Sequence, residues 1–171
     1  MNISFSNTHE DEKILKFLDK QVDDFTNYLE QTYPTDERTK RLISKLCGVG
    51  LLPFRRGRRD GSYNSGMFDH STGILYISPR DGNGNVRSQE SLNRSIVHEL
   101  GHGTRHKYPG EKSHSIDWES AWKFFLKIAT NELGWRVEAP CSSMVFYGLT
   151  YDDCQNCVWE TSYCPTGERF D

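Results

Sequence analysis

The segment His98-Glu99-Leu100-Gly101-His102 carries the residue types and the spacing of a zinc site. Histidines four residues apart in an α-helix project from the same face, so both imidazoles can bind one ion. A zinc ion held by two histidines and a third ligand keeps an open position, where a bound water becomes acidic. Glu99 is placed to accept the proton of that water. The pattern therefore predicts metal-assisted hydrolysis, most often of a peptide bond, with Glu99 as general base.

The third zinc ligand is open between residues that follow this motif. We prefer His114, because the loop before it contains turn residues and can bring the chain back towards the helix. Asp117 and Glu119 are alternatives, since a carboxylate can bind zinc, although both can equally serve as first-turn acids of the next helix. His106 would lie about 12 Å along a continuing helix from His98, too far to share the ion.

The residues around the motif predict the elements that position it. Residues 91–97 contain no Pro or Gly, and apolar residues recur there at helical spacing. Ser88 is expected to be the N-cap of this helix. Upstream, the apolar and aromatic residues 73–78 predict a β-strand. We therefore expect a small sheet to lie against the motif helix.

Residues 74–135 resemble the SprT-like and WLM metallopeptidases, which include the Spartan proteases that digest proteins crosslinked to DNA. The resemblance rests on the motif, a following loop, His114 and the large aromatic Trp118 four residues later. It implies zinc ligands His98, His102 and His114, with Glu99 catalytic. It also implies an α+β fold of the zincin-like kind, in which a small sheet packs on the motif helix.

Length and composition predict one compact domain with an appendage. The chain has 171 residues, of which 12% are aromatic, and a mean hydropathy of -0.72. Such values are typical of a charged surface around a packed core. We expect residues 1–138 to form the metallopeptidase domain, with packing helices at its N-terminus. Residues 139–171 would form a cysteine-containing C-terminal appendage.

Apolar spacing predicts the remaining helices. One helix should run to about residue 31, a second over residues 35–47 and a third from residue 117 to about residue 133. Cys47 would be a core residue of the second helix, and His70 a surface turn residue.

Four cysteines in the tail form the second chemical signal. Four thiolates can close a structural zinc site, so the chain would hold one catalytic and one structural zinc ion. In an oxidising setting the same residues would form two disulfides, for which three pairings exist. Unlinked thiols are the third alternative. These residues are Cys141, Cys154, Cys157 and Cys164.

Four arginines lie within five residues, which is typical of a contact with phosphate groups. The chain has a formal net charge of -3 and a pI near 6.1, so a contact with DNA would be one local patch. A solvated loop is the alternative. The DNA-related role of the resembling family agrees with such a patch by analogy. The residues are Arg55, Arg56, Arg58 and Arg59.

These observations together predict a zinc metallopeptidase that hydrolyses a protein or peptide substrate, including DNA-associated proteins. One alternative is a non-catalytic, zinc-binding structural or virion protein that retains the zincin fold. The other is a nucleic-acid-binding module built on the arginines and the tail cysteines. We recognise neither a secretory signal nor a membrane span, so we expect a cytoplasmic or nuclear protein without a membrane partner. A virion protein would have the same features.

Overall fold

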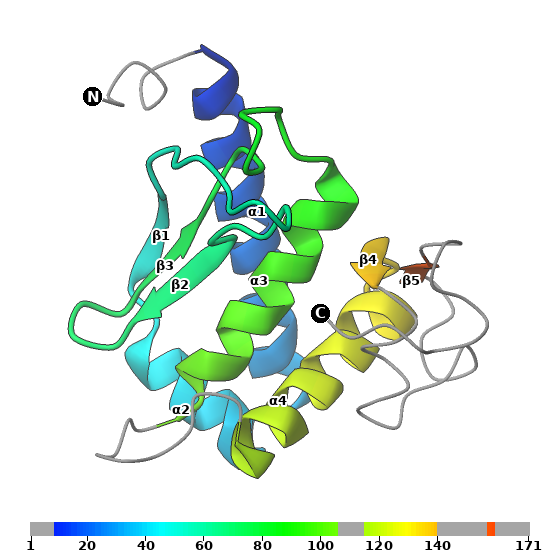
Figure 1. Cartoon of the computed structure of the whole chain (residues 1–171). Coiled ribbons are helices and arrows are strands. Elements are labelled where there is room, and N and C mark those ends of the chain that lie inside the picture. The colour runs from blue at the N-terminus through cyan, green and yellow to red at the C-terminus, as the bar shows by residue number, and fades with distance from the viewer. Residues whose placement is uncertain (1–8, 106–114, 140–156, 160–171) are drawn as a thin grey trace.

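The computed structural model describes residues 9–105, 115–139 and 157–159 (Figure 1). Helices and short strands alternate irregularly along this part of the chain, which confirms the predicted α+β class. The elements in chain order are α1 (His9–Thr32), α2 (Glu37–Lys45), β1 (Gly48–Leu51), β2 (Gly66–Asp69), β3 (Ile74–Ile77), α3 (Gln89–Gly103), α4 (Ile116–Lys127), the π-helical η2 (Ile128–Glu132), β4 (Val137–Ala139) and β5 (Cys157–Trp159).

The main sheet has three strands in the order β1-β3-β2. Strand β1 is parallel to β3, whereas β2 is antiparallel to β3, with Gly66 opposite Ile77. The predicted strand over residues 73–78 is thus the central strand. Its residues Leu75 and Ile77 are buried and their neighbours are half-buried, because successive side chains point to opposite faces of a sheet. The more buried face is the one that α3 and α1 cover.

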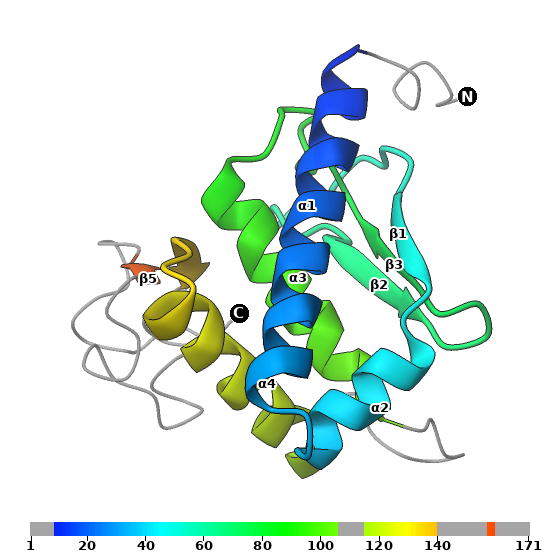
Figure 2. The same cartoon turned by 180° about the vertical axis from the view of Figure 1, so that it is seen from behind.

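Helix α1 packs along the back of the molecule against β1 and α3 (Figure 2). Its apolar residues recur every three or four positions, and Leu18, Phe25 and Leu29 are fully buried. The helix ends at Thr32, as its spacing predicts. In its first turn the carboxylate of Asp11 is buried and accepts a hydrogen bond from Arg80, 3.1 Å away. This contact attaches the start of α1 to the loop that follows β3.

Helix α2 is shorter at both ends than predicted. Asp36 is the N-cap, and its side chain accepts a hydrogen bond from the Arg38 N–H. The helix ends at Lys45, and the Cys47 N–H already donates to the Gly73 carbonyl, 2.7 Å away. The chain has by then turned into the sheet, so Cys47 is exposed and its predicted core position is wrong.

Helix α3 lies between the sheet and α4, and it contacts both (Figure 1). Ser88 is its N-cap, as predicted, and accepts a hydrogen bond from the Ser91 N–H, 3.1 Å away. Leu92, Ile96 and Leu100 form its buried stripe. The helix therefore has fixed neighbours on two sides, and these decide where each side chain of the motif lies.

Helix α4 continues into η2, so the predicted extent to about residue 133 is confirmed, with a π-helical end. Beyond it, β4 pairs in parallel with β5. The proposed boundary near residue 138 lies in β4, and most of the predicted appendage falls outside the described residues, so the domain division stays a prediction. None of the described helices combines the length and apolar character that crossing a membrane requires.

Candidate metal site on α3

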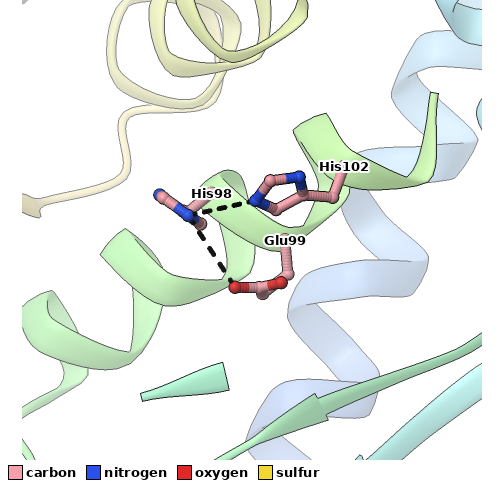
Figure 3. A group of neighbouring side chains, drawn as sticks. All are labelled: His98, Glu99 and His102. Carbon is pink, nitrogen blue, oxygen red and sulfur yellow. Dashed lines mark hydrogen bonds and ion pairs between the residues drawn. The ribbon is translucent and has the colours of Figure 1, made fainter. Parts of the chain in front are cut away.

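His98 and His102 lie on the same face of α3, one helical turn apart (Figure 3). Their Nε2 atoms are 3.3 Å apart, and both side chains are half-buried. Ligand atoms of His98, Glu99 and His102 all lie within 4.8 Å of one another. In the part of the chain that the structure describes, this is the group of His, Cys, Asp and Glu residues that could hold a metal ion.

The separation of the two nitrogens fits a zinc ion. Zinc binds imidazole nitrogen at about 2.0–2.1 Å in tetrahedral geometry, which places two nitrogen ligands about 3.3 Å apart. The Nε2 atoms of His98 and His102 have this separation. The distance between the two nitrogens is therefore compatible with one shared zinc ion.

Trp118 of α4 supports both rings. Its indole Nε1 donates to the His98 carbonyl oxygen, 3.2 Å away, and its ring stacks on that of His102 with 5.5 Å between centroids. Trp118 is 1% exposed. Gly101 allows this approach, because a Cβ there would lie 3.0 Å from the indole nitrogen. In the sequence Trp118 was notable as the large aromatic four residues after His114, but its position behind the histidines depends on the packing of α4 on α3.

The side chain of Glu99 points away from α4 and towards the sheet. Its side chain is 8% exposed and lies against Gly66 at the start of β2. Burial raises the pKa of Glu99 to about 8, although a hydrogen bond from the Phe68 backbone opposes the shift. Its Oε1 is 3.9 Å from Nε2 of His98 (Figure 3). This carboxyl group is therefore a buried contact between α3 and β2.

The candidates for the third zinc ligand either lie outside the described residues or lie away from the histidine pair. His114 and the rejected His106 lie outside the described residues. Asp117 and Glu119 occupy the first turn of α4, and neither belongs to the cluster of possible ligands in the described ranges. Trp118, which lies between them in sequence, faces the histidines, so helical geometry directs both carboxylates elsewhere. Glu119 instead forms an ion pair with Lys123, at 2.8 Å.

The other predicted site residues lie away from this cluster. His70 is exposed in the turn after β2, as predicted. The four arginines lie in the loop between β1 and β2 and are exposed. Cys141, Cys154 and Cys164 fall outside the described residues, and for Cys157 the structure describes only the backbone, in β5. A second zinc ion or disulfides in the tail stay predictions.

Comparison with known proteins gives a consistent result over nearly the whole chain. A family model described as Phycodnaviridae minor capsid protein P4 matches residues 1–169. The minor capsid protein P4 of Paramecium bursaria Chlorella virus 1 is 59% identical over 166 residues, which cover 96% of this chain and 92% of that protein. No solved structure matches the chain.

These matches correct the predicted function. The SprT-like or WLM-type zinc metallopeptidase is wrong, and so is its description as a hydrolase and protease, because the relative is a minor capsid protein. The role of Glu99 as general base and the peptide substrate belonged to that prediction and are withdrawn with it. A zincin-like fold has no support beyond the α+β class. The misleading resemblance was local, resting on residues 74–135, and any helix with this spacing brings two histidines together. The chain belongs to the Phycodnaviridae minor capsid protein P4 family.

Proposed function

We propose that this chain is a non-enzymatic structural component of a virus capsid. The observation that carries the proposal is the 59% identity to a minor capsid protein over nearly the full length of both chains. The proposal agrees with the alternative of a structural virion protein that the sequence left open. Its partners would be other virion proteins, and its location the virus particle.

The composition of purified virions tests this function. A structural subunit occupies a fixed number of positions per capsid, so its ratio to the major capsid protein should be constant. Quantitative mass spectrometry of virions of the encoding virus, in successive fractions of a density gradient, measures this ratio. We expect the same ratio in every fraction that contains intact particles, before and after a high-salt wash. Absence from intact particles, or a ratio that varies with the wash, would refute a structural role.

We also propose that His98 and His102 bind zinc as a structural ion of this capsid protein. The support is the 3.3 Å separation of the Nε2 atoms and the buried indole of Trp118 behind both rings. Glu99 is buried against β2, on the side of α3 that packs on the sheet. His114 is the proposed third ligand, since Asp117 and Glu119 do not join the cluster in the described part of the chain.

A structural zinc ion stabilises a fold by linking segments that are distant in the unfolded chain. Here the two histidines belong to α3, which contacts the sheet and α4. A ligand from the segment after α3 would fix that segment onto the centre of the molecule. The metal would thus stabilise the fold of a capsid subunit and would not take part in a reaction.

A further inference from the structure

The loop between β1 and β2 exposes four arginines within five residues. Arg55, Arg56, Arg58 and Arg59 are all exposed, and none of the four forms an ion pair with a carboxylate in the described part of the chain. The four arginines contribute +4 and the whole chain carries -3, so the rest of the chain, which includes Asp60 of the same loop, carries -7. The loop is therefore a positively charged patch on an otherwise acidic protein.

Backbone contacts attach this loop to the loop before α3. The Gly57 N–H donates to the Gly82 carbonyl, 2.8 Å away, in the loop before α3. A Cβ on Gly82 would lie 2.7 Å from the Gly57 Cα, so the close approach of the two loops requires glycine. The Arg58 N–H donates to the Ser62 carbonyl at 2.8 Å, and Asp60 accepts hydrogen bonds from both the N–H and the hydroxyl of Ser62. A loop already ordered in this way loses little conformational entropy when it binds a ligand.

The chemistry of the loop surface favours one class of ligand. Guanidinium groups bind phosphate oxygens through paired N–H donors and keep their charge at every physiological pH. The large apolar residues that are exposed in the described ranges are Met67, Val86 and Ile116, none of which belongs to this loop. The loop thus offers no exposed large apolar residue for the apolar core of a protein interface or for insertion into a membrane, whereas contacts with a nucleic-acid backbone rest on positive charge.

We propose that residues 55–59 bind phosphate groups of a nucleic-acid backbone without sequence selectivity. The contact rests on the loop alone and does not depend on the metal site or on the capsid role. Four phosphate contacts predict a log–log salt slope of about -3.6, so the affinity for duplex DNA should fall about 100-fold between 50 and 200 mM salt.

Fluorescence anisotropy with the full-length chain and a duplex DNA of mixed sequence tests this proposal. The test variant replaces Arg55, Arg56, Arg58 and Arg59 by Gln. The control variant replaces Lys13, Lys16, Lys40 and Arg41, four exposed cations of α1 and α2, by Gln. Both variants lose four positive charges, so a difference between them reports the position of the charge. We expect the loop variant to bind DNA about tenfold more weakly than the control or worse, with a salt slope smaller in magnitude by about 3.6.

Three results would overturn the proposal. The first is that the parent chain does not bind DNA at 50 mM salt, and the second is that the two variants bind DNA equally well. The third comes from vesicles of phosphatidylcholine and phosphatidylserine at the same concentration of anionic groups. Tighter binding to these vesicles than to DNA, lost in the loop variant, would assign the arginines to a lipid surface.

Discussion

Arg87 shows how a single side chain can join several elements. It is 7% exposed, and its guanidinium donates five hydrogen bonds of 2.6–3.1 Å, all to neutral oxygens. Burial lowers the pKa of Arg87, but an arginine whose donors are all satisfied stays charged at neutral pH. The acceptors are the hydroxyls of Ser91 and Ser95 and the carbonyls of Ser65, Ser78 and Ser91. This one residue thus connects α3 with the ends of the loops beside β2 and β3.

Substitution of Arg87 by Met should therefore destabilise the chain. Methionine fills similar space but leaves the buried carbonyl oxygens without donors, which lowers the free energy of unfolding by about 3 kcal/mol. Arg136→Met is the matched control, since Arg136 has a side chain that is 71% exposed and a single ion pair at 3.5 Å. That change should alter the free energy of unfolding by less than about 1 kcal/mol. Urea denaturation measures both values, and equal losses would show that the Arg87 network contributes nothing.

For single residues, the sequence predicted where some side chains lie and not where others do. The proximity of His98 and His102 was predictable, because a four-residue spacing acts within one helix. The burial of Glu99 was not, since it depends on β2, which lies more than 25 residues earlier in the chain. Arg87 could not be distinguished from an exposed arginine for the same reason.

Helix α2 depends on its N-cap residue, Asp36, for both hydrogen bonding and charge. Asp36 accepts the Arg38 N–H at 2.8 Å, and its carboxylate also pairs with the Arg38 guanidinium at 2.8 Å. These contacts lower the pKa of Asp36 below its ordinary 3.8, and the side-chain hydrogen bonds from Arg38 contribute most to the shift. A lowered pKa means that the ionised carboxylate stabilises the folded chain.

Asp36→Ala should lower the free energy of unfolding by about 1 kcal/mol at neutral pH, the usual effect of losing an N-cap. The stabilisation by Asp36 is fully present above pH 3.8, the pKa in the unfolded chain, and is lost as the pH falls through the lower folded pKa. The difference between parent and variant should therefore narrow in acid. Urea denaturation at neutral pH and below pH 3.8 measures it. A difference that is equal at both pH values would contradict the charged cap.

The elements differ in how far their sequences predict them. Helices α1 and α3 and the strand β3 were predictable, because each carries its own apolar pattern. Strand β1 was not, since it has four residues that include two glycines and is defined by its pairing with β3. The π-helical end of α4 also has no pattern of its own.

For the whole molecule, a local motif predicted the geometry of a site but not its function. The resemblance covered residues 74–135, whereas the family match covers residues 1–169. A capsid subunit is defined by surfaces that meet other proteins, and such surfaces have no short sequence pattern. The same two histidines can hold a catalytic or a structural ion, so their spacing alone did not distinguish a peptidase from a capsid protein.

A structural zinc ion on the histidine pair of α3, as proposed above, should change the stability of the whole molecule. A metal that binds only the folded chain stabilises it by about 2.7 kcal/mol at a concentration of 100 times its dissociation constant. For a chain of this size the melting temperature should then rise by about 5–10 °C. His70→Gln is the matched control, because His70 is an exposed histidine away from the pair.

The most direct measurement is the melting temperature of the full-length chain with saturating zinc and after its removal by a chelator. We predict that zinc raises the melting temperature of the parent and of His70→Gln by about 5–10 °C, and that of His98→Gln and His102→Gln not at all. A parent chain that melts at the same temperature with and without zinc would contradict the claim. His98 and His102 would then be a hydrogen-bonded pair of imidazoles beside Trp118.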